Sequence, residues 1–243
     1  MTAYEQKAMD ELAAWQREMK LLPSLVGDLA KRFQNRVNRI IPEKIHKAVT
    51  AAIKQMVRAV IFGSEYTTSA PLADGTLEER EKKARKSINI YKNTAATEGA
   101  ITGFGGVLLG LADFPLWLTL KMKLLHEIAT VYGFDVSEYK ERIYILHIFQ
   151  ITFSGQKHRN KIIRILENWE DEQENLPEDI SQFDWRTFQL EYRDYIDIAK
   201  LLQLVPFIGA PVGAYVNHRL TEKLGKTAMN AYRLRWTKHK LLN

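Results

Sequence analysis

Apolar residues recur along this chain at the three- and four-residue spacing of helices that pack on a core. In residues 4–21, Met9, Leu12, Trp15 and Met19 fall on one side and charged residues on the other, which predicts an amphipathic helix. This pattern fits a helix packed on the protein's own core as well as one docked in a membrane interface. Similar spacing predicts helices over 24–41, 42–62, from 76 into a glycine-rich stretch, 114–132, 135–153, 156–169, 184–206 and 213–238. Nowhere do more than a few residues alternate with period two, so we expect an all-α multi-helix bundle.

Two sequence signals predict where particular helices begin. Thr76 with Glu79, and Asp135 with Glu138, have the spacing of capping boxes, in which two side chains satisfy each other's backbone N–H groups. The acidic, proline-containing residues 170–183 predict a mobile connector instead of a helix.

The glycine-rich stretch 98–135 is the most unusual part of the sequence. Between residues 101 and 120 only Thr102, Asp113 and Thr119 carry polar side chains. Asp113 followed by Pro115 predicts a helix N-cap with proline in the first turn, so one helix ends near Leu111 and the next covers 114–132. Each glycine inside a helix costs about 1 kcal/mol relative to alanine, which a close approach of another helix or of lipid would offset. We therefore predict a helical hairpin that is buried in the protein or dips into a membrane.

Charge and cysteine content limit the classes of function. The chain has no cysteine, which excludes disulfides and thiolate metal sites, and the acidic residues near its start argue against a secretory signal, so we expect it inside the cell. Its net charge is +6, with basic clusters in 31–39, 82–86, 156–164 and 233–240. A basic face suits anionic lipid, nucleic acid or an acidic partner, although solvated helix faces have the same pattern. No helix-turn-helix or zinc module accompanies these clusters, so we expect no nucleic-acid partner.

Two blocks of the sequence resemble a known family. GAITGFGGVLLGLADFPLWLTLKMKLLHEIATVYGFD, from Gly99, is similar to the signature of the EcsC family, and PFIGAPVGAYVNHRLTEKLGKTAMNAYRLR, from Pro206, resembles its C-terminal block. The resemblance implies a single domain over 1–243. We expect residues 1–22 to form an N-terminal amphipathic helix that is separable from the rest. It also implies a role beside an ABC transporter, and it supplies no catalytic residues.

Motifs for catalysis or cofactor binding are incomplete. His126-Glu127 begins a zinc-hydrolase motif, but Thr130 occupies the position of the second ligand. The glycines follow no predicted strand and do not match a phosphate-binding loop, so we expect no cofactor and no resident metal. A metal-assisted hydrolase that uses Asp113 and nearby histidines is the alternative function, with a site assembled from scattered residues such as Glu98, Asp113, His126 and His218.

The sequence thus favours a non-enzymatic accessory protein, peripheral at the inner face of the cell membrane. We expect its partner to be an anionic membrane surface or a membrane protein, and the oligomeric state stays open. If the two glycine-containing segments pack together, Asp113 meets Asn217 or Arg219 inside the bundle. The residues that we expect to be structurally specialised, or to bind the partner, are Gly103, Gly105, Gly106, Gly110, Asp113, Pro115, Pro206, Gly209, Gly213 and Asn217.

Overall fold

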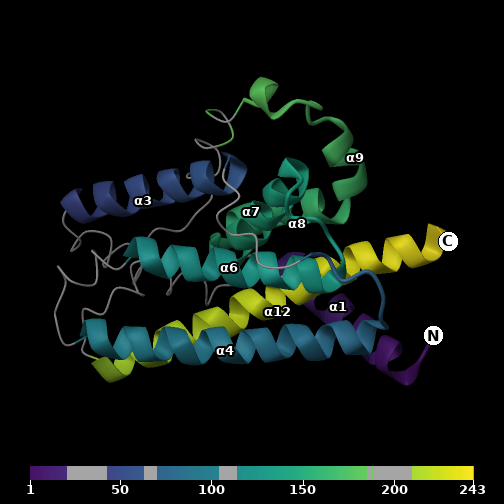
Figure 1. Ribbon diagram of the computed structural model, residues 1–243, viewed down its shortest axis with the longest axis horizontal. Coiled ribbons are helices and arrows are strands. Elements are labelled where there is room, and N and C mark those ends of the chain that lie inside the picture. Colours follow the sequence, from purple (N-terminus) through teal and green to yellow (C-terminus); the bar gives the residue numbers. More distant parts are fainter. Residues whose placement is uncertain are drawn as a thin grey trace.

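The computed structural model of this chain describes residues 1–20, 43–62, 70–103, 114–184, 186, 188 and 210–242 (Figure 1). These residues contain helices and no strand, which confirms the predicted all-α fold. In chain order the elements are α1 (Ala3–Lys20), α3 (Glu43–Phe62), α4 (Leu77–Gly103), α6 (Phe114–Tyr132), α7 (Tyr139–Phe153), α8 (Gln156–Glu167), α9 (Trp169–Glu174), the 3₁₀ helix η1 (Ile180–Gln182) and α12 (Ala210–Leu242).

The long helix α12 forms the centre of the bundle. It packs along α4 and also contacts α1, α6, α7 and α8. In Figure 1, α4 runs from right to left and α12 from left to right, so the two helices are antiparallel. Leu224, Ala228 and Tyr232, spaced four residues apart on α12, are fully buried. One face of this helix therefore belongs wholly to the core.

The predicted capping box at the start of α4 is confirmed. The Thr76 N–H donates to Glu79 Oε2 at 2.9 Å, and the Glu79 N–H donates to Thr76 Oγ1 at 3.3 Å. Both groups would otherwise lack a partner in the first helical turn. The cap therefore fixes the residue at which α4, the helix that packs along α12, begins.

The helix predicted over 114–132 has the same bounds in the structure, with Pro115 in its first turn. At its end Gly133 has a φ of 95°, and the N–H groups of Gly133 and Phe134 donate to the carbonyls of Thr130 and Ala129. This is a Schellman motif, for which glycine is suited because it adopts positive φ without strain. The other half of the predicted hairpin, with Leu111 and Asp113, lies outside the described residues.

The N-terminal helix α1 packs on the protein's own core. Its pattern fitted this arrangement as well as docking in a membrane interface. Its Leu12, Trp15 and Met19 are buried. Polar contacts add to this packing, since the Tyr4 hydroxyl donates to Glu81 on α4 and Glu11 pairs with Arg233 on α12. The apolar side of α1 is therefore already occupied by the bundle.

The capping box predicted at Asp135 and Glu138 is wrong. Helix α7 begins at Tyr139, so Glu138 is itself the N-cap residue, and its side chain makes no capping hydrogen bond. Asp135 instead accepts a hydrogen bond from the Ser137 N–H at 2.8 Å. The Asp135 carboxylate is thus bound in a local turn that precedes the helix.

The acidic segment 170–183 was predicted to be a mobile connector, and this prediction is wrong for its helical parts. Helix α8 ends at Glu167, two residues before its predicted end, and α9 starts at Trp169. The Trp169 ring is buried, 5.0 Å from the ring of Tyr144, and the Tyr139 hydroxyl donates to the Pro177 carbonyl. These contacts order the segment although its composition is that of a solvated loop.

Candidate functional site

Several helix ends lie at the same end of the bundle. Figure 1 shows the last turn of α4 and the first turns of α3, α6 and α12 together at the left. Two of them are joined by a hydrogen bond, because Trp117 Nε1 on α6 donates to Asn217 Oδ1 on α12. Both side chains are buried, so this bond fixes the start of α6 against the start of α12.

At the same end of the bundle, two large apolar side chains are exposed. Leu116 precedes Trp117 and is 51% exposed, and Tyr215 lies two residues before Asn217 and is 58% exposed. Arg219 covers Tyr215: its Nε donates to the tyrosine hydroxyl at 2.9 Å, and its guanidinium carbon lies 5.3 Å from the ring centre. We call exposed Pro115, Leu116, Tyr215 and Arg219 the helix-end patch.

A small hollow adjoins the patch between α3 and α6. Its volume is about 160 Å³, and Met56 and Ala59 on α3 face Pro115 and Leu118 on α6 across it. Most of its lining is apolar. The hollow therefore continues the apolar character of the helix-end patch into the bundle.

The structure places only some of the predicted residues. Pro115 lies in the first turn of α6, Gly103 ends α4 and Gly213 lies in the first turn of α12. Asn217 is buried with Trp117 as its partner, whereas Arg219, predicted to be a candidate inside the bundle, is exposed. The remaining predicted residues lie outside the described part of the chain: Gly105, Gly106, Gly110, Asp113, Pro206 and Gly209.

Sequence reasoning missed the glycine at which two helices come closest. A Cβ atom added to Gly225 on α12 would lie 2.4 Å from Ile88 Cγ1 on α4, far inside van der Waals contact. The signal was present, because a glycine in the middle of a long helix is costly without such a contact. Five of the thirteen glycines lie within residues 99–110 and directed the prediction to that stretch.

A buried charge cluster joins α1, α4 and α12. Arg233 donates from Nε and Nη2 to the two oxygens of Glu81, both at 2.6 Å, and its Nη1 lies 2.9 Å from Glu11. Tyr4 donates a further hydrogen bond to Glu81 at 2.7 Å. Burial alone would raise the pKa of Glu81, but the hydrogen bonds and charge of Arg233 lower it overall.

A second buried pair lies on the other side of α12. Arg235 pairs with Glu141 on α7, and Tyr232 donates to Glu141 at 2.6 Å. The Arg235 guanidinium also stacks 3.7 Å from the centre of the Phe134 ring. Burial raises the pKa of Glu141 although Arg235 and Tyr232 oppose the change. Because these charged groups bind one another within the core, they serve to position helices.

His126, which is buried, and His147, which is half-buried, lie in separate places. His126 Nδ1 is 2.8 Å from the Met122 carbonyl, and His147 Nδ1 is 3.0 Å from Gln150 Oε1. Burial lowers the pKa of each ring to about 4. Among the described residues, no three histidine, aspartate or glutamate side chains are grouped as metal ligands would be. The alternative of a metal-assisted hydrolase stays a prediction, since Asp113 is not among those residues.

None of the described helices combines the length and the apolar character needed to cross a bilayer.

Comparison with known proteins places the chain among bacterial relatives. The sequence model of the EcsC protein family matches residues 6–237. The chain is similar to Protein EcsC of Bacillus subtilis (strain 168), with 42% identity over 231 residues that cover 95% of each chain. It is also similar to Uncharacterized protein YdbA of that strain, with 28% identity over 221 residues that cover 82% of this chain and 80% of the relative. No solved structure matches it.

Proposed function

Because this chain belongs to the EcsC protein family, and because exposed apolar side chains lie near the starts of α6 and α12, we propose that it binds the membrane surface as a non-enzymatic accessory protein. It acts at the inner face of the cell membrane, beside an ABC transporter or another membrane protein. The helix-end patch is the observation that carries this proposal. Through this patch the bundle contacts the lipid headgroup region.

The chemistry of the patch suits a membrane interface. Burying an exposed leucine side chain in an apolar medium yields about 1.5–3 kcal/mol, so Leu116 favours insertion below the headgroups. Tyr215 presents an apolar ring with a polar hydroxyl, which is the character of aromatic residues at the boundary between lipid and water. Arg219, held on that ring at 2.9 Å from the hydroxyl, adds a cation for lipid phosphates.

The amino-acid sequence next to the patch supports the same orientation. Helix α4 ends at Gly103 and α6 begins at Phe114, at the end of the bundle that carries the patch. Residues 101–120, which include both of these helix ends, contain only three polar side chains. The hollow between α3 and α6 also opens beside Pro115 and offers an apolar recess to the end of an acyl chain. Among the described residues, Pro115 and Leu116 thus bring apolar groups to the start of α6.

Vesicle flotation tests the proposal. The purified chain is mixed with vesicles of phosphatidylglycerol and phosphatidylcholine and centrifuged through a density gradient. We expect the wild-type chain to float, and the double variant Leu116→Glu and Tyr215→Glu to bind at least about tenfold more weakly, since a tenfold change requires only about 1.4 kcal/mol.

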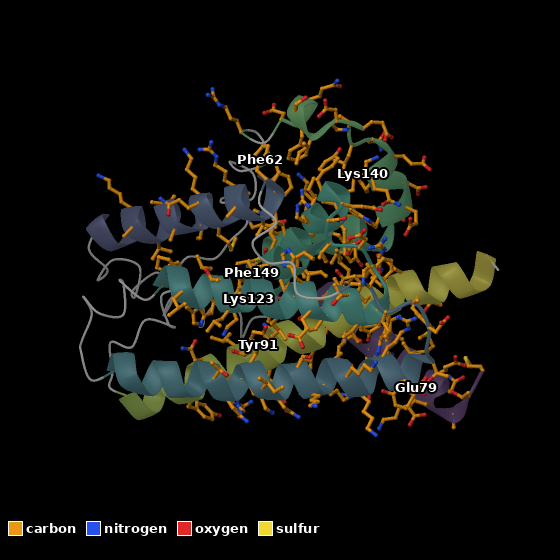
Figure 2. The ribbon with its side chains drawn as sticks, in the orientation of Figure 1. Phe62, Glu79, Tyr91, Lys123, Lys140 and Phe149 are labelled. Carbon is orange, nitrogen blue, oxygen red and sulfur yellow. The ribbon has the colours of Figure 1, made fainter. Side chains whose placement is uncertain are left out.

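Phe62→Glu provides a matched control. Phe62 is also an exposed apolar residue, at 48%, but it lies at the C-terminal end of α3 and belongs neither to the patch nor to the lining of the hollow (Figure 2). We expect this variant to float like the wild type, and circular dichroism checks that each variant is folded. A wild-type chain that stays with the soluble fraction would overturn the proposal, and so would equal binding by the folded double variant.

A further inference from the structure

A second and larger hollow lies between α4 and α6, away from the helix-end patch. Its volume is about 500 Å³, and its lining includes Lys83, Ile90 and Glu127. Along α6, Glu127 is eleven residues beyond Leu116, which corresponds to about 16 Å at the rise of an α-helix. The hollow is thus separate from the surface that we assign to membrane binding.

A half-buried carboxylate, that of Glu127, lines this hollow. Ser87, which is 6% exposed, donates its hydroxyl hydrogen to Glu127 Oε1. The pKa of Tyr91 is raised to about 12, first by burial and then by the charge of Glu127 and a hydrogen bond to it. Figure 2 shows Tyr91 in the space between α4 and α6. Two neutral hydroxyls therefore orient the carboxylate, and they leave part of its capacity to accept hydrogen bonds unused.

The charge of Glu127 is not neutralised by a cation of the described chain. Neither it nor the two lysines of the lining, Lys83 and Lys86, takes part in an ion pair among the described residues. Both lysine side chains are exposed, one helical turn apart on α4. The hollow therefore presents one negative and two positive groups.

The rest of the lining is largely apolar. Ile90 is 54% exposed, an unusual position for a large apolar side chain on a helix that is otherwise charged on its outer face. Leu72 and Val131 line the same hollow and are half-buried. A ligand that met the charged groups would also cover apolar surface here.

We propose that this hollow binds a zwitterion of the phosphoethanolamine class, whose ammonium group contacts Glu127 and whose phosphate contacts Lys83 and Lys86. A simple anion is disfavoured, because the carboxylate would repel it within the site. A simple cation is disfavoured by the two lysines. The apolar wall at Ile90 accommodates a substituent on the phosphate, which in a phospholipid is the glycerol and the start of its acyl chains.

Calorimetric titration with matched ligands tests the site and identifies the source of the ligand. The probes are phosphoethanolamine, dihexanoyl-phosphatidylethanolamine kept below its micelle concentration, and dihexanoyl-phosphatidylglycerol, which lacks the amine. If phosphoethanolamine binds as tightly as dihexanoyl-phosphatidylethanolamine, the ligand of the site is a soluble molecule. At least tenfold tighter binding of dihexanoyl-phosphatidylethanolamine assigns a lipid, with Ile90 in contact with its chains.

Substitutions separate the two charged halves of the site. Glu127→Gln keeps the size of the side chain, and we expect it to weaken binding of the amine ligands at least tenfold. Binding of phosphatidylglycerol should tighten, because the carboxylate no longer repels the anion. Lys83→Gln with Lys86→Gln should weaken every phosphate ligand. Lys82→Gln is the control, because Lys82 is exposed on α4 but does not line the hollow.

Two results would overturn the inference: no binding of either amine ligand, or equal binding by wild type and the folded Glu127→Gln variant. Neither result depends on vesicle flotation, which reports on Leu116 and Tyr215. A failure of this site and a failure of membrane binding are therefore distinguishable.

Discussion

Gly225 sets the distance between the two longest helices. Its position on α12 faces Ile88 on α4, where an added Cβ would lie 2.4 Å from Cγ1 and 2.6 Å from Cδ1. Isoleucine is branched at Cβ and has little rotamer freedom in a helix, so it cannot turn away without cost. A side chain at position 225 must therefore push the helices apart.

Gly225→Ala tests this contact. We expect the free energy of unfolding to fall by about 1–3 kcal/mol, because overpacking outweighs the better helix propensity of alanine. Urea denaturation gives the value. In the background of Ile88→Ala, the same substitution should cost less or become stabilising, since the clashing atoms are gone. Equal losses in both backgrounds would show that Ile88 is not the cause.

Two histidines with a lowered pKa, His126 and His147, predict how stability depends on pH. Burial holds the pKa of His126 and His147 at about 4, below the value of about 6.5 expected in the unfolded chain. Between these values the unfolded state binds more protons than the folded state, so stability rises with pH and is fully present only above about 6.5. Each histidine contributes a slope of up to about 1.4 kcal/mol per pH unit.

Urea denaturation between pH 7.5 and 4.5 measures this slope. His147→Phe preserves the ring contacts with Trp169 and Phe188 but removes one titrating group. We expect the variant to lose less stability than the wild type on acidification, whatever its stability at pH 7.5. Imidazole resonances that titrate near pH 6.5 in both of these histidine rings of the folded wild type would contradict the prediction.

Among the helices, the starts that carry a capping residue or a proline were predicted best from the sequence. The Thr76–Glu79 cap and Pro115 placed the starts of α4 and α6, because capping and proline geometry act within one turn. The helix α9 was missed because its order comes from Trp169 buried against Tyr144, a contact between segments that no local pattern contains. Likewise, the Trp117–Asn217 bond joins residues 100 positions apart, so the sequence indicated Asn217 but not its partner.

The packing of α4 against α12 also depends on charge. Glu81 on α4 is bound by two nitrogens of Arg233 on α12, and both side chains are almost fully buried. Such a pair is weak support for stability compared with apolar packing, but removing one partner leaves a buried charge uncompensated. Any alignment of the two helices that separated Glu81 from Arg233 would therefore cost free energy.

Glu81→Leu measures that penalty. We expect a loss of about 3–5 kcal/mol in the free energy of unfolding, because Arg233 loses its main partner. Adding Arg233→Met should recover much of the loss. The exposed pair Glu222–Lys226 on α12 gives the control, since Glu222→Ala should cost less than about 1 kcal/mol. A double variant as unstable as the sum of its single variants would show that the two charges act independently.

For the whole molecule, the proposed membrane contact combines two forces with different dependence on salt. The net charge of +6 attracts the chain to anionic lipid over a distance set by the ionic strength. The apolar side chains of the helix-end patch act only on contact, and salt does not screen their transfer into lipid. The two contributions can therefore be separated by raising the salt concentration.

Flotation at about 0.1 M and about 1 M NaCl makes this separation, since the Debye length shortens from about 10 Å to about 3 Å. We expect the wild-type chain to bind anionic vesicles more weakly at high salt but still measurably, through Leu116 and Tyr215. The variant with glutamate at both positions should retain only the salt-sensitive part and detach at about 1 M NaCl. If wild type and variant lose the same fraction of binding, the contact is purely electrostatic, and the apolar patch has another purpose.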